Sequence, residues 1–193
     1  MRKKWIAGSA MSCALALGLL AGTAHAADNI VANGGFESGL ASWTPSGFLL
    51  EGYDYGVGDI ARSGTSAFYG GGVTDPGFLS QVLTTEVGTR YDVQLWLYSD
   101  GFLPNSFQVR AGGALLLNVD DDMQQQFGLL TTSFVATSMQ TTLQFALRND
   151  AGFLRVDDVS VSAMAAAVPE PQTYALMALG LGALALIRRR RAH

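Results

Sequence analysis

The side chains that most often carry catalysis lie near the two ends of this 193-residue chain. Its only cysteine is Cys13, and its two histidines are His25 and His193. The segment 27–167 therefore offers no thiol nucleophile, no Ser–His pair and no imidazole metal ligand. The chemistry left to it is that of carboxylates, which act as acids, bases and ligands of hard cations such as Ca²⁺.

Carboxylates dominate the charge of that segment. It contains fifteen Asp and Glu residues against five arginines and no lysine, which gives a net charge of −10. Because phosphate contacts come mainly from Lys and Arg, we expect no nucleic-acid partner. A divalent cation or a neutral ligand suits such a domain better.

The C-terminal end carries an apolar run followed by charge. Residues 174–187 are apolar, and Arg188, Arg189, Arg190 and Arg191 follow them directly. As a helix the run would reach about 21 Å, short of the roughly 30 Å hydrocarbon core of a bilayer. A buried core helix is the alternative, but it would not end in four arginines, which are typical of a cytoplasmic stop. We expect a short transmembrane helix.

The N-terminal end has the features of an export signal. Arg2, Lys3 and Lys4 precede an apolar, alanine-rich stretch, and Ala24-His25-Ala26 matches a small-x-small cleavage site. We expect a signal helix that is cleaved after Ala26; an uncleaved anchor is the alternative. The remaining chain would then divide into a domain at 27–163, a linker at 164–172 and the membrane segment with its arginine tail at 173–193.

The domain is expected to be all-β. Short β-rich runs alternate with Gly, Asn, Asp and Pro, a pattern typical of sandwiches and barrels. The expected strands include NIVANGGF, GFLLEGY, SAFYG and SFQVRAGGALLLNV, the last as a hairpin around Gly112-Gly113. The stretch 78–99 is predicted to be two strands with a turn near Val87-Gly88. Trp43 is expected in the core.

One predicted strand, YDVQLWLYS, indicates a binding face. Alternate residues of a strand point to opposite faces, so Tyr91, Val93, Leu95 and Leu97 would face the core. Gln94, Trp96 and Tyr98 would face outward, mixing aromatic and polar groups as sugar-binding faces do. Arg110 would join them if its strand lies alongside, together with Gln108, Gln144 and Arg148. The alternative is that a loop covers Trp96 and that the polar groups are only solvated.

Three stretches resemble carbohydrate-binding modules with the galactose-binding-like jelly-roll β-sandwich. They are NIVANGGFESGLASWTPSG at the start of the domain and TTSFVATSMQTTLQFAL and GFLRVDDVSVSA at its end. The resemblance spans residues 29–162 and implies a jelly-roll fold. It also implies a structural Ca²⁺ held by Glu37 and Asp157, with Asp158 as the alternate if a β-bulge swaps their faces. The other interpretation is a capped turn and a pair of surface aspartates.

The C-terminal segment 168–191 resembles a PEP-CTERM sorting signal. Pro169-Glu170-Pro171, the short apolar helix and the terminal arginines carry the resemblance. It implies that an exosortase in the inner membrane of a Gram-negative bacterium cuts near Pro-Glu-Pro. The protein would be anchored transiently in that membrane and then reach the cell surface or the extracellular space.

These features favour an exported, non-enzymatic surface protein that binds extracellular polysaccharide. The residues expected to bind sugar are Gln94, Trp96, Tyr98 and Arg110, and the loop residues Tyr53, Tyr55 and Tyr69 are the alternatives. A structural or adhesive protein of the biofilm matrix is the second hypothesis. A carboxylate-dependent glycosidase is the third, although no particular pair of carboxylates stands out.

Overall fold

The computed structural model describes residues 28–48, 50–164, 176, 178–181 and 188. The chain divides into two units. One consists of Ala26–Ala166, and the second consists of Met1–His25 with Ala167–His193. The predicted signal helix and its cleavage site lie outside the described residues, as do Pro169-Glu170-Pro171 and most of the predicted membrane segment. Residues 176, 178–181 and 188 are helical. Within the described part of the chain, no helix is both long and apolar enough to cross a membrane.

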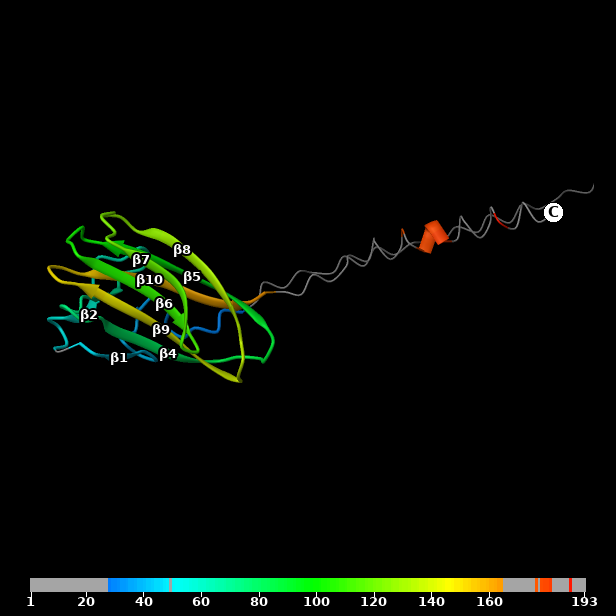
Figure 1. Ribbon diagram of the computed structural model, residues 1–193, viewed down its shortest axis with the longest axis horizontal. Helices are drawn as coiled ribbons and strands as arrows, with labels where there is room; N and C mark the ends of the chain where they lie inside the picture. Colours follow the sequence, from blue (N-terminus) through cyan, green and yellow to red (C-terminus); the bar gives the residue numbers. More distant parts are fainter. Residues whose placement is uncertain (1–27, 49, 165–175, 177, 182–187, 189–193) are drawn as a thin grey trace, which may run out of the picture. The chain divides into compact units, whose positions relative to one another are not determined.

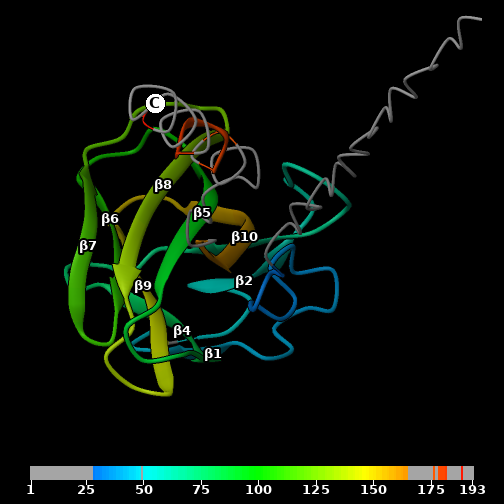
Figure 2. The same ribbon diagram turned by 90° about the vertical axis from the view of Figure 1, so that its right-hand side faces the viewer.

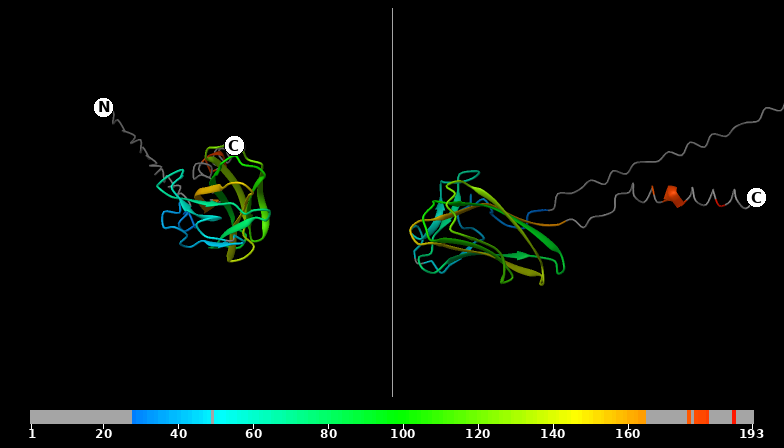
Figure 3. Two further views of the ribbon diagram at one scale, coloured as in Figure 1. Left: turned by 90° about the vertical axis from the view of Figure 1, so that its left-hand side faces the viewer. Right: turned by 45° about the horizontal axis from the view of Figure 1, so that its top comes forward.

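The unit Ala26–Ala166 contains two five-stranded antiparallel sheets (Figure 1). The first, here called the β9 sheet, consists in spatial order of β1 (Thr44–Ser46), β4 (Gly77–Thr84), β9 (Gln140–Asn149), β6 (Asn105–Ala111) and β7 (Ala114–Asp120). The second, the β10 sheet, consists of β2 (Tyr55–Gly58), β3 (Ala67–Gly70), β10 (Leu154–Ala163), β5 (Arg90–Ser99) and β8 (Gly128–Val135). The two sheets form separate layers (Figure 2 and Figure 3). The predicted all-β sandwich is confirmed.

The core lies between the sheets and follows from the alternation of apolar side chains. On β5 the predicted inward residues are all buried, and on β9 and β6 the apolar positions are buried in the same way. Burial of apolar area contributes about 25 cal/mol per Å², so these faces hold the two layers together. The buried residues of these three strands include Tyr91, Val93, Leu95, Leu97, Phe107, Val109, Leu143, Phe145 and Leu147. Because both layers and this core belong to the unit Ala26–Ala166, the segment 27–167 contains the contacts needed to fold alone.

An aromatic cluster forms part of the core. Phe36 is fully buried and stacks on Trp43 with ring centroids 5.3 Å apart. The indole N–H of Trp43 donates a hydrogen bond to the carbonyl of Asn33 at 3.0 Å. The prediction that Trp43 belongs to the core is confirmed.

The predicted hairpin at Gly112-Gly113 is present, whereas two of the other predicted strands are not. The hairpin between β6 and β7 turns at Gly112 and Gly113, with φ of 55° and 85°, as a type I′ turn requires. The predicted first strand is wrong: only Asn29 pairs, in one bridge to Ser162, and the chain then enters turns in which Asn33 has a φ of 52°. The predicted strand at 47–53 is also wrong: among its described residues only Glu51 pairs, in one bridge to Tyr55, and a turn begins at Gly52.

Candidate functional site

A bulge in β10 places two aspartates against a loop. The pairing of β10 with β5 shifts register between Asp157 and Ser160, and Asp158 has a φ of 48°. The bulge that the sequence suggested is therefore present. Asp157 is opposite Trp96 on the outer side of the sheet, yet it is fully buried, because the loop 62–66 covers it.

Asp157 anchors that loop through backbone amides. Its carboxylate accepts hydrogen bonds from the N–H groups of Arg62 at 2.7 Å, Ser63 at 3.1 Å and Asp158 at 2.7 Å. Burial raises the pKa of Asp157, and the three amide donors oppose that rise by stabilising the carboxylate. The loop is thus held by a carboxylate that has little contact with water.

Asp158 and Glu37 bind the same loop from its exposed side. Asp158 forms an ion pair with Arg62 at 2.8 Å and accepts a hydrogen bond from the Ser63 hydroxyl at 2.7 Å. Glu37 accepts bonds from the hydroxyl and the amide of Thr65, both at 2.8 Å, and from the Ser66 amide at 2.9 Å. The Thr65 bonds lower the pKa of Glu37, with the hydroxyl as the main cause.

The three carboxylates predicted to hold Ca²⁺ therefore converge on one loop. Gly64 permits the close approach: a Cβ there would lie 2.3 Å from Glu37 Oε1, and its φ is 62°. Oxygen donors of this kind fit a hard cation. Among the described residues, no three Asp, Glu, His or Cys side chains form a metal site by themselves. Backbone carbonyls of the loop would have to complete the coordination.

The loop also covers the predicted stacking platform. The guanidinium carbon of Arg62 lies 4.3 Å from the centre of the Trp96 ring, a cation–π contact. Tyr98 is covered in turn by Arg155, at 5.2 Å, and packs against Phe127. Trp96 and Tyr98 do face outward as predicted, and Trp96 is half-buried with Arg62 of the loop over its ring, as the alternative interpretation expected.

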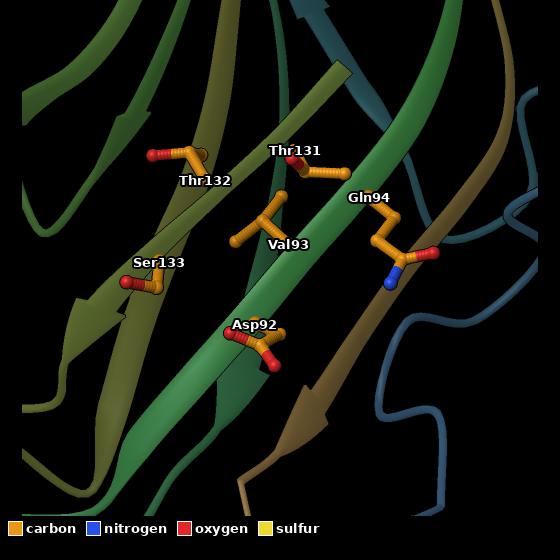
Figure 4. A pocket seen from close by; sticks show the side chains of 6 residues that line it. All are labelled: Asp92, Val93, Gln94, Thr131, Thr132 and Ser133. Carbon is orange, nitrogen blue, oxygen red and sulfur yellow. The ribbon is translucent and has the colours of Figure 1, made fainter. Parts of the chain in front are cut away.

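Gln94 lies in the open part of the same face. It pairs with Thr131 on β8 and with Ser160 on β10. A hollow of about 500 Å³ lies here, and Figure 4 shows the side chains around it. Its lining residues are Asp92, Val93, Gln94, Thr131, Thr132 and Ser133. The hollow thus offers hydroxyl, amide and carboxylate groups.

Arg110 does not join this face. Its strand, β6, belongs to the β9 sheet, whereas Gln94, Trp96 and Tyr98 belong to the β10 sheet. The expectation of one shared face is wrong because both strands bury their apolar sides in the same core, so their outer sides point in opposite directions. Arg110 instead donates to Gln108 Oε1, at 2.9 and 3.2 Å, on the outer side of the β9 sheet.

Two of the three alternative tyrosines line a second hollow. Tyr53 and Tyr69 border it together with Phe153 and Arg155, whereas Tyr55 packs on Phe48, with ring centroids 4.9 Å apart. Neither the loop 62–66 nor Arg155 is among the residues that the sequence predicts to bind a ligand. The polar, glycine-containing sequence RSGTS was the only signal for the loop.

The fold is that of carbohydrate-binding jelly-roll modules. The domain resembles TmCBM61, solved in complex with β-1,4-galactotriose (TM-score 0.58, 18% identity, 71% of this chain and 99% of that one). It also resembles the CBM22-1 xylan-binding domain of Xyn10C from Paenibacillus barcinonensis (0.55, 18%, 75% and 100%). A third similar structure is the K3 cleaved adhesin domain of Lys-gingipain from Porphyromonas gingivalis W83 (0.56, 13%, 70% and 98%).

The C-terminal end matches a known sorting signal. Residues 167–191 match the PEP-CTERM protein-sorting motif, as the sequence predicted. The motif implies processing by an exosortase and sorting to the surface of a Gram-negative bacterium. No curated protein matches the chain.

Proposed function

We propose that this protein is exported, held briefly in the inner membrane, processed by an exosortase and delivered to the cell surface, where its jelly-roll domain binds polysaccharide without catalysis. The sorting motif supports the first part of the proposal. The likeness of the fold to carbohydrate-binding modules supports the second. The modules named above are binding domains, which is the reason we propose no enzymatic activity.

The observation that carries sugar binding is the open hollow around Gln94. Its amide and the hydroxyls of Thr131 and Ser133 are the groups that hydrogen-bond sugar hydroxyls, and Asp92 adds an acceptor. Trp96 borders this strip on the same strand. A sugar that stacks on the Trp96 ring would compete with Arg62, so the polar strip is the better candidate for the main contact.

Replacing Gln94 with alanine is expected to weaken polysaccharide binding by about tenfold, because the exposed amide would lose its hydrogen bonds to the ligand without disturbing the core. The segment 27–167 would first be screened on a glycan array containing β-1,4-galactan and xylan, and affinities then measured by titration. Trp96→Ala should weaken binding less than Gln94→Ala, because Arg62 already lies over the Trp96 ring, with circular dichroism confirming the fold.

Gln144→Ala is the matched control, since Gln144 occupies β9 on the other sheet and pairs with Arg110. If Gln144→Ala weakens binding and Gln94→Ala does not, the sugar binds the β9 sheet, and Arg110 regains its predicted role. If no glycan is retained and the segment self-associates in analytical ultracentrifugation, the alternative of a structural or adhesive matrix protein replaces this proposal. Release of sugar from an array ligand would instead indicate a glycosidase.

We also propose that Ca²⁺ binds between Glu37, Asp157 and Asp158. The support is their convergence on the loop 62–66, where, within the described part of the chain, Arg62 is the one cation that pairs with these three carboxylates. A cation would relieve the repulsion among the carboxylates, and the loop would supply carbonyl oxygens. The role of this Ca²⁺ would be structural, because it would hold in place the loop 62–66, whose Arg62 lies over Trp96.

Calcium is expected to raise the melting temperature of the segment 27–167 by about 8 °C at a hundredfold excess over its Kd, equivalent to about 2.7 kcal/mol. Glu37→Gln should reduce this rise, whereas Glu86→Gln, an exposed change away from the loop, should not. Differential scanning calorimetry in Ca²⁺ and in EDTA measures the shift. Identical melting curves in the two buffers would refute the calcium site.

A further inference from the structure

A second hollow lies on the β10 sheet, apart from the strip around Gln94. Its volume is about 230 Å³, and five of its lining residues have aromatic or charged side chains that could meet a ligand: Tyr53, Asp59, Tyr69, Phe153 and Arg155. Tyr53 is 76% exposed, and Tyr69 meets Phe153 edge-on at 5.2 Å. Ile60, Gly52 and Gly58 complete the lining of the hollow.

Arg155 is the unusual member of this group. Its strand position lies between Tyr69 on β3 and Tyr98 on β5, so its neighbours on both sides are aromatic. The Nη1 atom is buried and has no hydrogen-bond partner, the only such buried side-chain atom among the described residues. Within the same described residues, no carboxylate forms an ion pair with Arg155, although Asp59 lines the hollow.

The other four arginines of the domain all have partners. Arg62 and Arg148 form ion pairs with Asp158 and Asp150, at 2.8 and 2.7 Å. Arg90 donates to the Ser133 hydroxyl, and Arg110 donates to Gln108. Among the described arginines of the domain, Arg155 is therefore the one with no hydrogen-bond or ion-pair acceptor, and its contact with the Tyr98 ring supplies none.

The physical cost of this arrangement points to a ligand. A buried N–H without an acceptor is unfavourable, because it has given up water and gained no bond in return. An oxygen from a bound molecule would remove that cost. Since a guanidinium binds a carboxylate through two parallel hydrogen bonds, a carboxylate is the group that fits Arg155 best.

We propose that this hollow binds a uronic acid residue of an acidic polysaccharide. Arg155 would bind the sugar carboxylate, and the rings of Tyr53, Tyr69 and Phe153 would pack against the pyranose C–H groups. Asp59 would accept a hydrogen bond from a ring hydroxyl away from the carboxylate. This site goes beyond the proposed function: it lies outside the strip around Gln94 and selects a charged sugar.

The test is a titration of ¹⁵N-labelled segment 27–167 with methyl α-D-galacturonide, methyl α-D-galactoside and sodium acetate, followed by NMR. The galacturonide is expected to shift the amides of Gly52, Gly58 and Phe153 and to bind at least about tenfold more tightly than the galactoside or acetate, since charge-assisted hydrogen bonds are about twice as strong as neutral ones. Equal affinities for the two sugars, or no shift in these amides, would overturn the proposal. Acetate binding as tightly as the galacturonide would overturn the sugar part, because it would indicate a general anion site.

Three variants localise the effect. Arg155→Gln should weaken galacturonide binding at least about tenfold. The affinity of Arg155→Lys should lie between that of Arg155→Gln and that of the native protein, since lysine keeps the charge but lacks the planar fork of the guanidinium. Arg110→Gln, the same change on the other sheet, should leave the affinity unchanged. Tyr53→Ala, at an exposed position that cannot disturb the core, should also weaken binding, so the proposal stays testable if Arg155→Gln fails to fold. Native affinity in both Arg155→Gln and Tyr53→Ala would contradict it, whatever happens to Gln94→Ala.

Discussion

Replacing Asp157 with alanine is expected to destabilise the segment 27–167 by about 3 kcal/mol and to lower its melting temperature by about 10 °C in calcium-free buffer. The carboxylate is fully buried and accepts three backbone N–H groups. Alanine would leave these donors without an acceptor in a place that water reaches poorly, so the loop 62–66 would lose its main attachment. Calorimetry or urea unfolding measures the change.

The matched control is Asp158→Asn. Asp158 is the next residue, but its side chain and that of Arg62 are 24% and 41% exposed, and an exposed ion pair contributes less than about 1 kcal/mol. Asparagine also tolerates the left-handed φ of 48° at this position. If the two variants have the same stability, buried hydrogen bonding by Asp157 is not what holds the loop.

Calcium links this prediction to the proposed metal site. In EDTA the Asp157→Ala variant tests only the bonds to the loop amides. In Ca²⁺ it should also lose the rise in melting temperature expected of the native segment, because a ligand of the cation would be missing. A variant that is destabilised in EDTA but keeps the full calcium shift would separate the two roles and exclude Asp157 from the metal site.

The regular parts of the domain were predictable from local sequence. The alternation in β5 and the paired glycines after β6 each specify their own structure, so Leu95 was expected inside, Gln94 outside and the chain reversal at Gly112. The convergence of Glu37 with Asp157 was predictable only through the resemblance to jelly-roll modules. Residue types alone do not bring positions 120 residues apart to one loop.

The sheet assignment was not predictable, and this explains the error over Arg110. Strands β5 and β6 follow each other along the chain and both alternate apolar and polar residues, so they read as neighbours. In the sandwich they lie in different sheets. Alternation identifies the buried side of a strand but does not tell which sheet it joins, and that depends on long-range pairing such as β6 with β9.

Replacing Pro169, Glu170 and Pro171 with alanines is expected to abolish C-terminal processing in a Gram-negative host that contains the cognate exosortase. These residues lie outside the described part of the structure, and the sorting motif at 167–191 carries the prediction. Proline disfavours a helix at and just before its own position and so favours the extended backbone that a protease needs in its substrate. Alanine would remove that restraint and the glutamate charge together. Mass spectrometry of the intact protein measures the outcome.

The native protein should lose the apolar run and the arginines, so its mass should correspond to a chain that ends near residue 170. The variant should keep all residues to His193 and stay in the membrane fraction. As a helix, the apolar run 174–187 would reach only about 21 Å, which would suit a segment that is needed only until cleavage. A host without exosortase is the control and should leave the native chain uncut. Cleavage of the alanine variant at the native position would mean that the enzyme reads the helix and Arg188–Arg191 rather than the tripeptide. If the native protein remains uncut in the exosortase host, the apolar run 174–187 is a permanent membrane anchor and not a temporary signal.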